Sequence, residues 1–192
     1  MRHPFETWPA SHRRAAFLGV AAVSIVVWLL LAWINADIRT DAAPNGQVSL
    51  QMAGSAEAAT RIVGSWQAEG VMHKIGLSVG FDYVFMVAYG LALAAGCAAL
   101  AVRCRVRNRS GLAGLGAAAA WGVWIAAGLD AVENALMVPI LSDPGSGAPG
   151  AVKAFALGKF ALLIAAVVFL VVAGVATSGR RPTLFRSTAL SG

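Results

Sequence analysis

The chain has 192 residues, of which 58% are hydrophobic and only 12% are charged, and its formal net charge is +6. A soluble domain of this size typically carries about 25% charged residues. The composition therefore excludes an ordinary soluble domain and favours a protein whose main solvent is lipid. The basic excess does not indicate nucleic-acid binding, because no aromatic residues are interleaved with the arginines in a soluble module.

Four apolar runs occupy most of the chain, at about 15–34, 71–102, 112–141 and 151–176. Each reaches the roughly 20 residues that a membrane-spanning helix needs. The first run is also longer than the roughly 7–15 residues of a signal-peptide core, so we expect it to be a membrane helix. Short connections make sequential helices antiparallel neighbours. The sequence predicts an all-α polytopic membrane protein, with residues 1–192 forming a single domain built as an antiparallel bundle of four transmembrane helices.

Basic residues are distributed unevenly between the two sides of this predicted bundle. Most lie in the N-terminal segment, in the loop after the second run and in the C-terminal tail: Arg2, Arg13, Arg14, Arg103, Arg105, Arg107, Arg109, Arg180, Arg181 and Arg186. Because cytoplasmic loops carry the excess of Lys and Arg, both termini are expected in the cytoplasm. These arginines would contact anionic lipid headgroups there.

The first outer loop, residues 35–70, is the longest segment outside the predicted spans. Within it, 56–66 is typical of a short amphipathic helix, with Ser55 as N-cap and one apolar face formed by Ala59, Ile62, Val63 and Trp66. Such a helix would lie in the membrane interface or cover the outer mouth of the bundle. The preceding VSLQM, at 48–52, alternates apolar and polar residues. It fits either a short extended stretch or chain lying on the helix ends.

The cysteines and histidines show no pattern of a redox or metal site. Seven helical positions separate Cys97 from Cys104 by about 10 Å, which is too far for a disulfide. The histidines, His3, His12 and His73, are scattered without ligand spacing. Carboxylates could hold a hard cation, but a lysine among them would compete, so neither a metal nor a cofactor is expected.

Ionisable and amide side chains interrupt the apolar runs at matching depths. Asp130, Glu133 and Asn134 are at i, i+3 and i+4, and therefore share one helix face. Counting 1.5 Å per residue from the outer ends of the second and fourth runs places Asp82 and Lys159 at a similar level. A charged residue at the centre of a membrane helix costs about 2.5–3.5 kcal/mol, so these groups should face one another or a wet cavity.

These residues predict a polar pocket in the outer half of the bilayer. Its lining would comprise Asp82, Asp130, Glu133, Asn134 and Lys159, with Tyr83 or Tyr89 at its edge. Three carboxyl groups face one lysine, so at least one should be protonated near neutral pH. The predicted function is binding of a lipid-like or small amphipathic ligand, with Lys159 holding an anionic group or pairing with a carboxylate.

Four alternatives compete with a ligand pocket. The polar residues could simply bond the helices together. Asp130 and Glu133 could instead be the acid and base of an enzyme acting on an apolar substrate. A proton-coupled transporter would require a homodimer, because four helices are few for a transport path. An accessory subunit of a larger membrane complex would have no site of its own.

Three stretches carry a family resemblance: residues 38–66, LSVGFDYVF at 77–85 and GLDAVEN at 128–134. Together they resemble a pattern of small four-helix bacterial inner-membrane proteins. The resemblance covers most of the chain up to the third run. It implies a location in the bacterial inner membrane and carries no activity with it.

Overall fold

The computed structural model describes residues 3–7, 9–145 and 147–179, and those residues form helices and loops without any strand. The long helices are α1 (Ala10–Asp37), α4 (Met72–Val106), α5 (Ser110–Ser142) and α6 (Pro149–Ser178); the short ones are η1 (Pro4–Thr7), α2 (Gln47–Gln51) and α3 (Ala56–Ala68). The prediction of an all-helical protein is confirmed. The tail arginines at 180, 181 and 186, and Arg2, lie outside the described residues.

Each long helix contains a span that is long and apolar enough to cross a membrane. The spans within the described residues are Ala15–Asp37, Met72–Val106, Ser110–Ser142 and Pro149–Ser178, close to the four predicted runs. At 1.5 Å per residue, the 35 residues of α4 extend about 50 Å. This exceeds the roughly 30 Å of a hydrocarbon core. These four spans define a multi-pass membrane protein.

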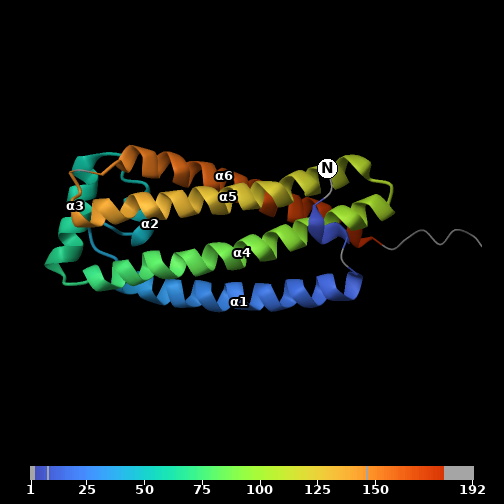
Figure 1. Ribbon diagram of the computed structural model, residues 1–192, viewed down its shortest axis with the longest axis horizontal. Coiled ribbons are helices and arrows are strands. Elements are labelled where there is room, and N and C mark those ends of the chain that lie inside the picture. The colour runs from blue at the N-terminus through green and yellow to red at the C-terminus, as the bar shows by residue number, and fades with distance from the viewer. Residues whose placement is uncertain (1–2, 8, 146, 180–192) are drawn as a thin grey trace, which may run out of the picture.

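The four long helices run side by side, and α5 packs against both α4 and α6 (Figure 1). In contrast, α1 lies on the outer side of α4, which supplies its main contacts. We call the end of the bundle that carries α2 and α3 the loop end, and the end that carries η1 the terminal end (Figure 1). The core is thus formed by α4, α5 and α6, with α1 added along one edge.

At the loop end, α3 crosses the ends of the long helices (Figure 1). Its first turn is capped by the Ser55 hydroxyl, which accepts a hydrogen bond from the Ala58 backbone N–H at 3.2 Å. Its apolar face is buried among residues of α4, α5 and α6, including Ile75, Met137 and Val152. Trp66 is fully buried and donates its indole N–H to the Ile38 carbonyl at 2.7 Å. The helix therefore packs on the bundle.

Residues 47–51 form the short helix α2, so the extended alternative for this stretch is wrong. Gly46 precedes α2 at φ 57° and Gly54 follows it at φ 71°, both in the left-handed region. A Cβ at Gly46 would also overlap the side chain of Asn35. Glycine is thus required at the entry to α2 for both its backbone angle and its lack of a side chain.

The terminal end is packed mainly with small residues. Its buried cluster contains Ala94, Cys97, Cys104, Ala113, Ala120, Val123, Ala166, Phe169 and Ala173. Both cysteines are free thiols, as the helical spacing predicted. A Cβ added at Gly116 would lie 2.5 Å from the Phe169 ring and 2.8 Å from the Ala101 methyl. Glycine therefore allows α5 to approach its neighbours closely here.

The N-terminal turn η1 folds back onto this end and packs against α4. Glu6 is buried there and forms an ion pair with Arg105. The His3 backbone N–H donates to Glu6 Oε1 at 2.9 Å, and the His3 ring lies edge-on to Trp121, with centroids 5.1 Å apart. Burial lowers the pKa of His3 below its ordinary value of 6.5.

Candidate functional site

Polar side chains from four helices meet toward the loop end of the bundle. These side chains, which we call the polar cluster, form two groups. The ion-pair group consists of Tyr89, Asp130, Glu133 and Lys159. The amide group consists of Gln47, Ser78, Asp82 and Asn134. The two groups are joined through α5, where Asp130 and Asn134 are one helical turn apart.

Lys159 is the centre of the ion-pair group. Its Nζ lies 2.5 Å from Asp130 Oδ1 and 2.9 Å from Glu133 Oε2. The second oxygen of Asp130 accepts a hydrogen bond from the Tyr89 hydroxyl at 2.8 Å. All four side chains are buried. Lys159 is therefore paired with two carboxyl groups of α5.

Gln47 of α2 is the centre of the amide group. Its Nε2 donates to Asp82 Oδ2 at 3.3 Å and to Asn134 Oδ1 at 3.5 Å, while its Oε1 accepts from the Ser78 hydroxyl at 2.5 Å. Asn134 Nδ2 also donates to Asp82 Oδ2, at 3.0 Å. Asp82 is half-buried, and the other three members of the group are buried. The Gln47 side chain of α2 therefore links α4 to α5 through hydrogen bonds.

Glu133 differs from the other cluster members in its incomplete bonding. The residue is fully buried, and its Oε1 has no hydrogen-bond partner among the described residues. A buried acceptor without a partner costs about 1–3 kcal/mol, and more if it is charged. On α2, the buried Gln51 Oε1 is also without a partner in the described part of the chain. Both atoms would accept a hydrogen bond from a donor.

The helix α2 lies at the loop end (Figure 1), contacts α4, α5 and α6, and bonds the cluster through Gln47. Leu50 anchors it in the loop-end core, and the Gln47 backbone N–H donates to Asn35 Oδ1 at 3.0 Å. Neither Gln47 nor Ser78 was among the predicted site residues. The signal for Gln47 was its place directly after the Pro44–Gly46 turn, which by itself does not show that the chain turns inward.

Six of the seven predicted pocket residues lie together, and Tyr83 does not. Its side chain is 38% exposed, and its hydroxyl donates to the Ala131 carbonyl at 3.2 Å, outside the cluster. Tyr89 is the tyrosine that belongs to the cluster, through its hydrogen bond to Asp130. Lys159 bonds Asp130 and Glu133 rather than Asp82.

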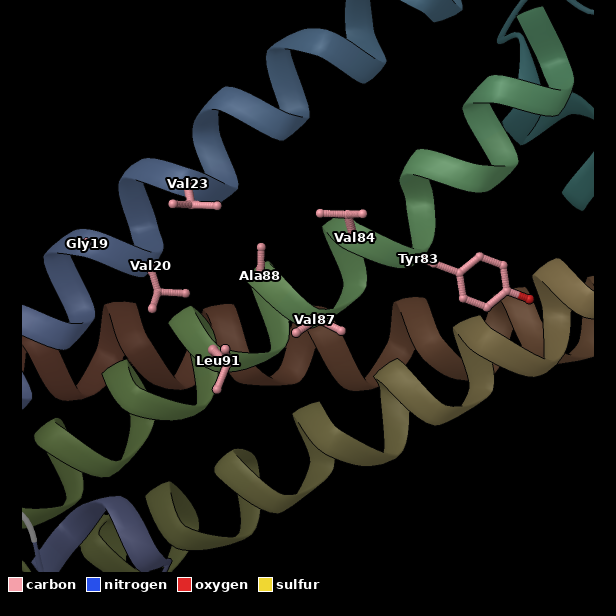
Figure 2. Close-up of a pocket in the computed structure, with 8 residues that line it drawn as sticks. All are labelled: Gly19, Val20, Val23, Tyr83, Val84, Val87, Ala88 and Leu91. Carbon is pink, nitrogen blue, oxygen red and sulfur yellow. The ribbon is translucent and has the colours of Figure 1, made fainter. Parts of the chain in front are cut away.

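Tyr83 instead lines an apolar groove of about 500 Å³ between α1 and α4 (Figure 2). Leu91, another lining residue, lies nine residues after Asp82, which is about two and a half helical turns. The groove and the polar cluster are therefore on opposite faces of α4. The hollow in Figure 2 is not the polar pocket that the sequence predicts.

The carboxyl groups of the cluster can accept hydrogen bonds and pair with a positively charged group. Within the described residues, no three His, Cys, Asp or Glu side chains are grouped closely enough to hold a metal ion. The molecule belongs, by its fold, to the multi-pass helical membrane proteins. No protein-family model matches the chain, and neither a curated protein nor a solved structure matches it. Its resemblance to four-helix inner-membrane proteins stays a prediction.

Proposed function

We propose that this protein binds an amphipathic molecule through the buried polar cluster, and that the bound end of the molecule is cationic or donates hydrogen bonds. The observation that carries the proposal is the fully buried Glu133 carboxylate, whose Oε1 has no partner in the described residues. A donor placed against this oxygen would remove an unfavourable desolvation cost. Removal of this cost would contribute favourably to the free energy of ligand binding.

The charge of the cluster favours this class of ligand over an anionic one. Three carboxyl groups, on Asp82, Asp130 and Glu133, surround the single ammonium of Lys159, and two of them already contact it. An anionic headgroup would have to displace a carboxylate from Lys159 and would be repelled by the others. The predicted role of Lys159 as an anion holder is thus less favourable than its role as a partner of Asp130 and Glu133.

Access to the cluster would involve α2. This helix has five residues, is flanked by glycines at 46 and 54, and bonds the cluster through the one side chain of Gln47. Moving it aside would break fewer contacts than separating α5 from α4 or from α6. With cytoplasmic termini, as the arginine distribution predicts, the loop end would face outward, and the ligand would enter from the outer side of the bacterial inner membrane.

Acid–base catalysis on an apolar substrate is the second candidate, favoured by the different bonding of two neighbouring carboxyl groups. Asp130 is bonded through both oxygens, whereas Glu133 keeps one oxygen free. Glu133 would then exchange the proton, and Asp130 would fix Lys159. Conversion of an added lipid by purified protein would separate this activity from binding alone.

The binding proposal is tested with a matched pair of amphiphiles. Dodecylamine and dodecanoate carry similar chains and opposite charges, so we expect only the amine to raise the thermal midpoint of the detergent-solubilised protein. Glu133→Gln keeps the side-chain size and removes the charge, and it should abolish the response. Glu57→Gln makes the same change at an exposed carboxylate of α3, outside the cluster, and should respond like the parent. Equal shifts with both amphiphiles, or an amine response that survives in Glu133→Gln, would contradict the proposal.

A further inference from the structure

The apolar groove between α1 and α4 is separate from the polar cluster (Figure 2). Its walls are Gly19, Val20 and Val23 of α1 and Tyr83, Val84, Val87, Ala88 and Leu91 of α4. We infer that this groove is a binding site for one hydrocarbon chain of a membrane phospholipid. The inference does not depend on the proposed function, because the polar cluster lies on the opposite face of α4.

The chemistry of the walls excludes a polar occupant. All lining side chains are apolar except Tyr83. The Tyr83 hydroxyl is already bonded to the Ala131 carbonyl of α5, and Figure 2 shows it pointing away from α1. A polar group placed in the groove would find no hydrogen-bond partner and would lose its hydration. The occupant must therefore be hydrocarbon at this depth.

The position of the groove along the helices makes a lipid chain available. Its residues belong to the candidate spans Ala15–Asp37 and Met72–Val106, and those of α4 lie near the middle of the helix. The hydrocarbon core of a bilayer is about 30 Å thick, so the groove falls within it. The α1 wall of the groove also belongs to a helix that makes its main contacts with α4 alone.

The size of the groove favours a single chain over a helix of another protein. From Tyr83 to Leu91 the groove covers eight residue steps, or about 12 Å, and a helix about 10–12 Å wide would occupy roughly 1,000 Å³ over that length. The groove has about 500 Å³. A second copy or a partner helix could lie over this hollow but could not fill it, whereas a lipid chain can.

Gly19 contributes to the groove by lacking a side chain. A Cβ added there would meet no atom within 4 Å, and the residue has ordinary helical backbone angles. A larger residue at this position would therefore occupy the groove without straining the helix. Gly174 on α6 is also open around its missing Cβ, and it does not line the groove. A leucine at Gly19 should therefore fill the groove, and a leucine at Gly174 is the matched control.

The test measures phospholipid bound to the full-length chain. Protein extracted in mild detergent is stripped of lipid and then mixed with dioleoylphosphatidylglycerol, and bound lipid is counted by native mass spectrometry. We expect the parent and Gly174→Leu to bind a single phospholipid that withstands collisional activation. Gly19→Leu should lose it. Val23→Phe, which fills the groove from an exposed position, should lose it as well. Helical content by circular dichroism and gel-filtration elution confirm that each variant is folded.

Two outcomes would overturn the inference. In the first, Gly19→Leu and Val23→Phe bind as much phospholipid as Gly174→Leu, which would mean that the retained lipid lies elsewhere. In the second, the parent is a dimer that both filled variants disrupt, which would assign this face to a contact between copies. Neither outcome bears on the amine response of Glu133, so the two proposals fail separately.

Discussion

The loop end and the terminal end of the bundle are held together by different means. The loop-end core contains large side chains such as Trp66, Leu50 and Met137, and beside it lie the two polar groups. The terminal-end core is made mostly of alanines with Cys97, Cys104 and Phe169, and it contains the close approach at Gly116. One end combines bulky and charged residues, and the other depends on small ones.

This difference shows how a small bundle can hold charges within its candidate spans. In a membrane, helix association depends on close packing and on interhelical hydrogen bonds, since lipid is as apolar as the helix surfaces. Small residues at the terminal end bring the backbones of the long helices close together. At the loop end, α2 is inserted among the long helices, and its Gln47 supplies hydrogen bonds that the long helices alone would lack.

The largest effect is expected from Lys159→Met, which removes the ammonium and keeps most of the side-chain volume. Two buried carboxylates, on Asp130 and Glu133, would lose their ion-pair partner. Breaking a buried pair by removing one member costs about 3–5 kcal/mol. The free energy of unfolding in detergent, measured by denaturant titration, should fall by this amount.

Second substitutions identify the partner of Lys159. Adding Asp130→Asn to Lys159→Met should recover part of the loss, because one unpaired charge is removed. Adding Asp82→Asn should recover little, since Asp82 bonds Gln47 and Asn134 instead. If Lys159→Met were as stable as the parent, or if Asp82→Asn were the better rescue, the contacts assigned to the ion-pair group would be wrong.

A smaller effect is expected at the terminal end from Gly116→Ala. The added methyl would contact the Phe169 ring and the Ala101 methyl at distances that real side chains do not adopt, so the helices must shift. Overpacking of this kind costs about 1–3 kcal/mol. Gly114→Ala is the control, because a Cβ there meets nothing within 4 Å. Comparable stability of the two variants would show that α5 is not closely packed at Gly116.

Much of this arrangement could be predicted because it depends on regular helix geometry. The length of each apolar run determines the candidate spans, and the fixed rise per residue brings Asp82, Asp130 and Lys159 to one level. The i, i+3, i+4 spacing correctly predicts that Glu133 and Asn134 share the face of Asp130. These inferences use only distances along a helix.

The features that sequence reasoning missed depend on contacts between segments. Five residues at 47–51 are too few to distinguish a helical from an alternating pattern, so α2 and the inward position of Gln47 were not predicted. Tyr83 and Tyr89 are both near the level of the cluster, and only the packing of α4 against its neighbours decides which is buried. The groove results from the position of α1 relative to α4, which no residue pattern specifies.

The smallest expected effect concerns pH and the docking of η1 at the terminal end. Because burial lowers the pKa of His3 below 6.5, the folded state binds the His3 proton less readily than the undocked segment does. Above pH 6.5 the ring is neutral in both states and docking is unaffected; as the pH falls below 6.5, the undocked segment takes up the proton and docking weakens. Hydrogen exchange at Glu6, whose backbone N–H donates to the His3 carbonyl at 2.9 Å, should therefore show less protection at about pH 5.5 than at about pH 8, after correction for intrinsic rates. His3→Phe keeps an aromatic ring against Trp121 and cannot titrate. The Glu6–Arg105 ion pair is present in both proteins, so the difference between their pH responses reports on His3. An identical pH response in the parent and in His3→Phe would show that the buried imidazole does not contribute to closing this end of the bundle.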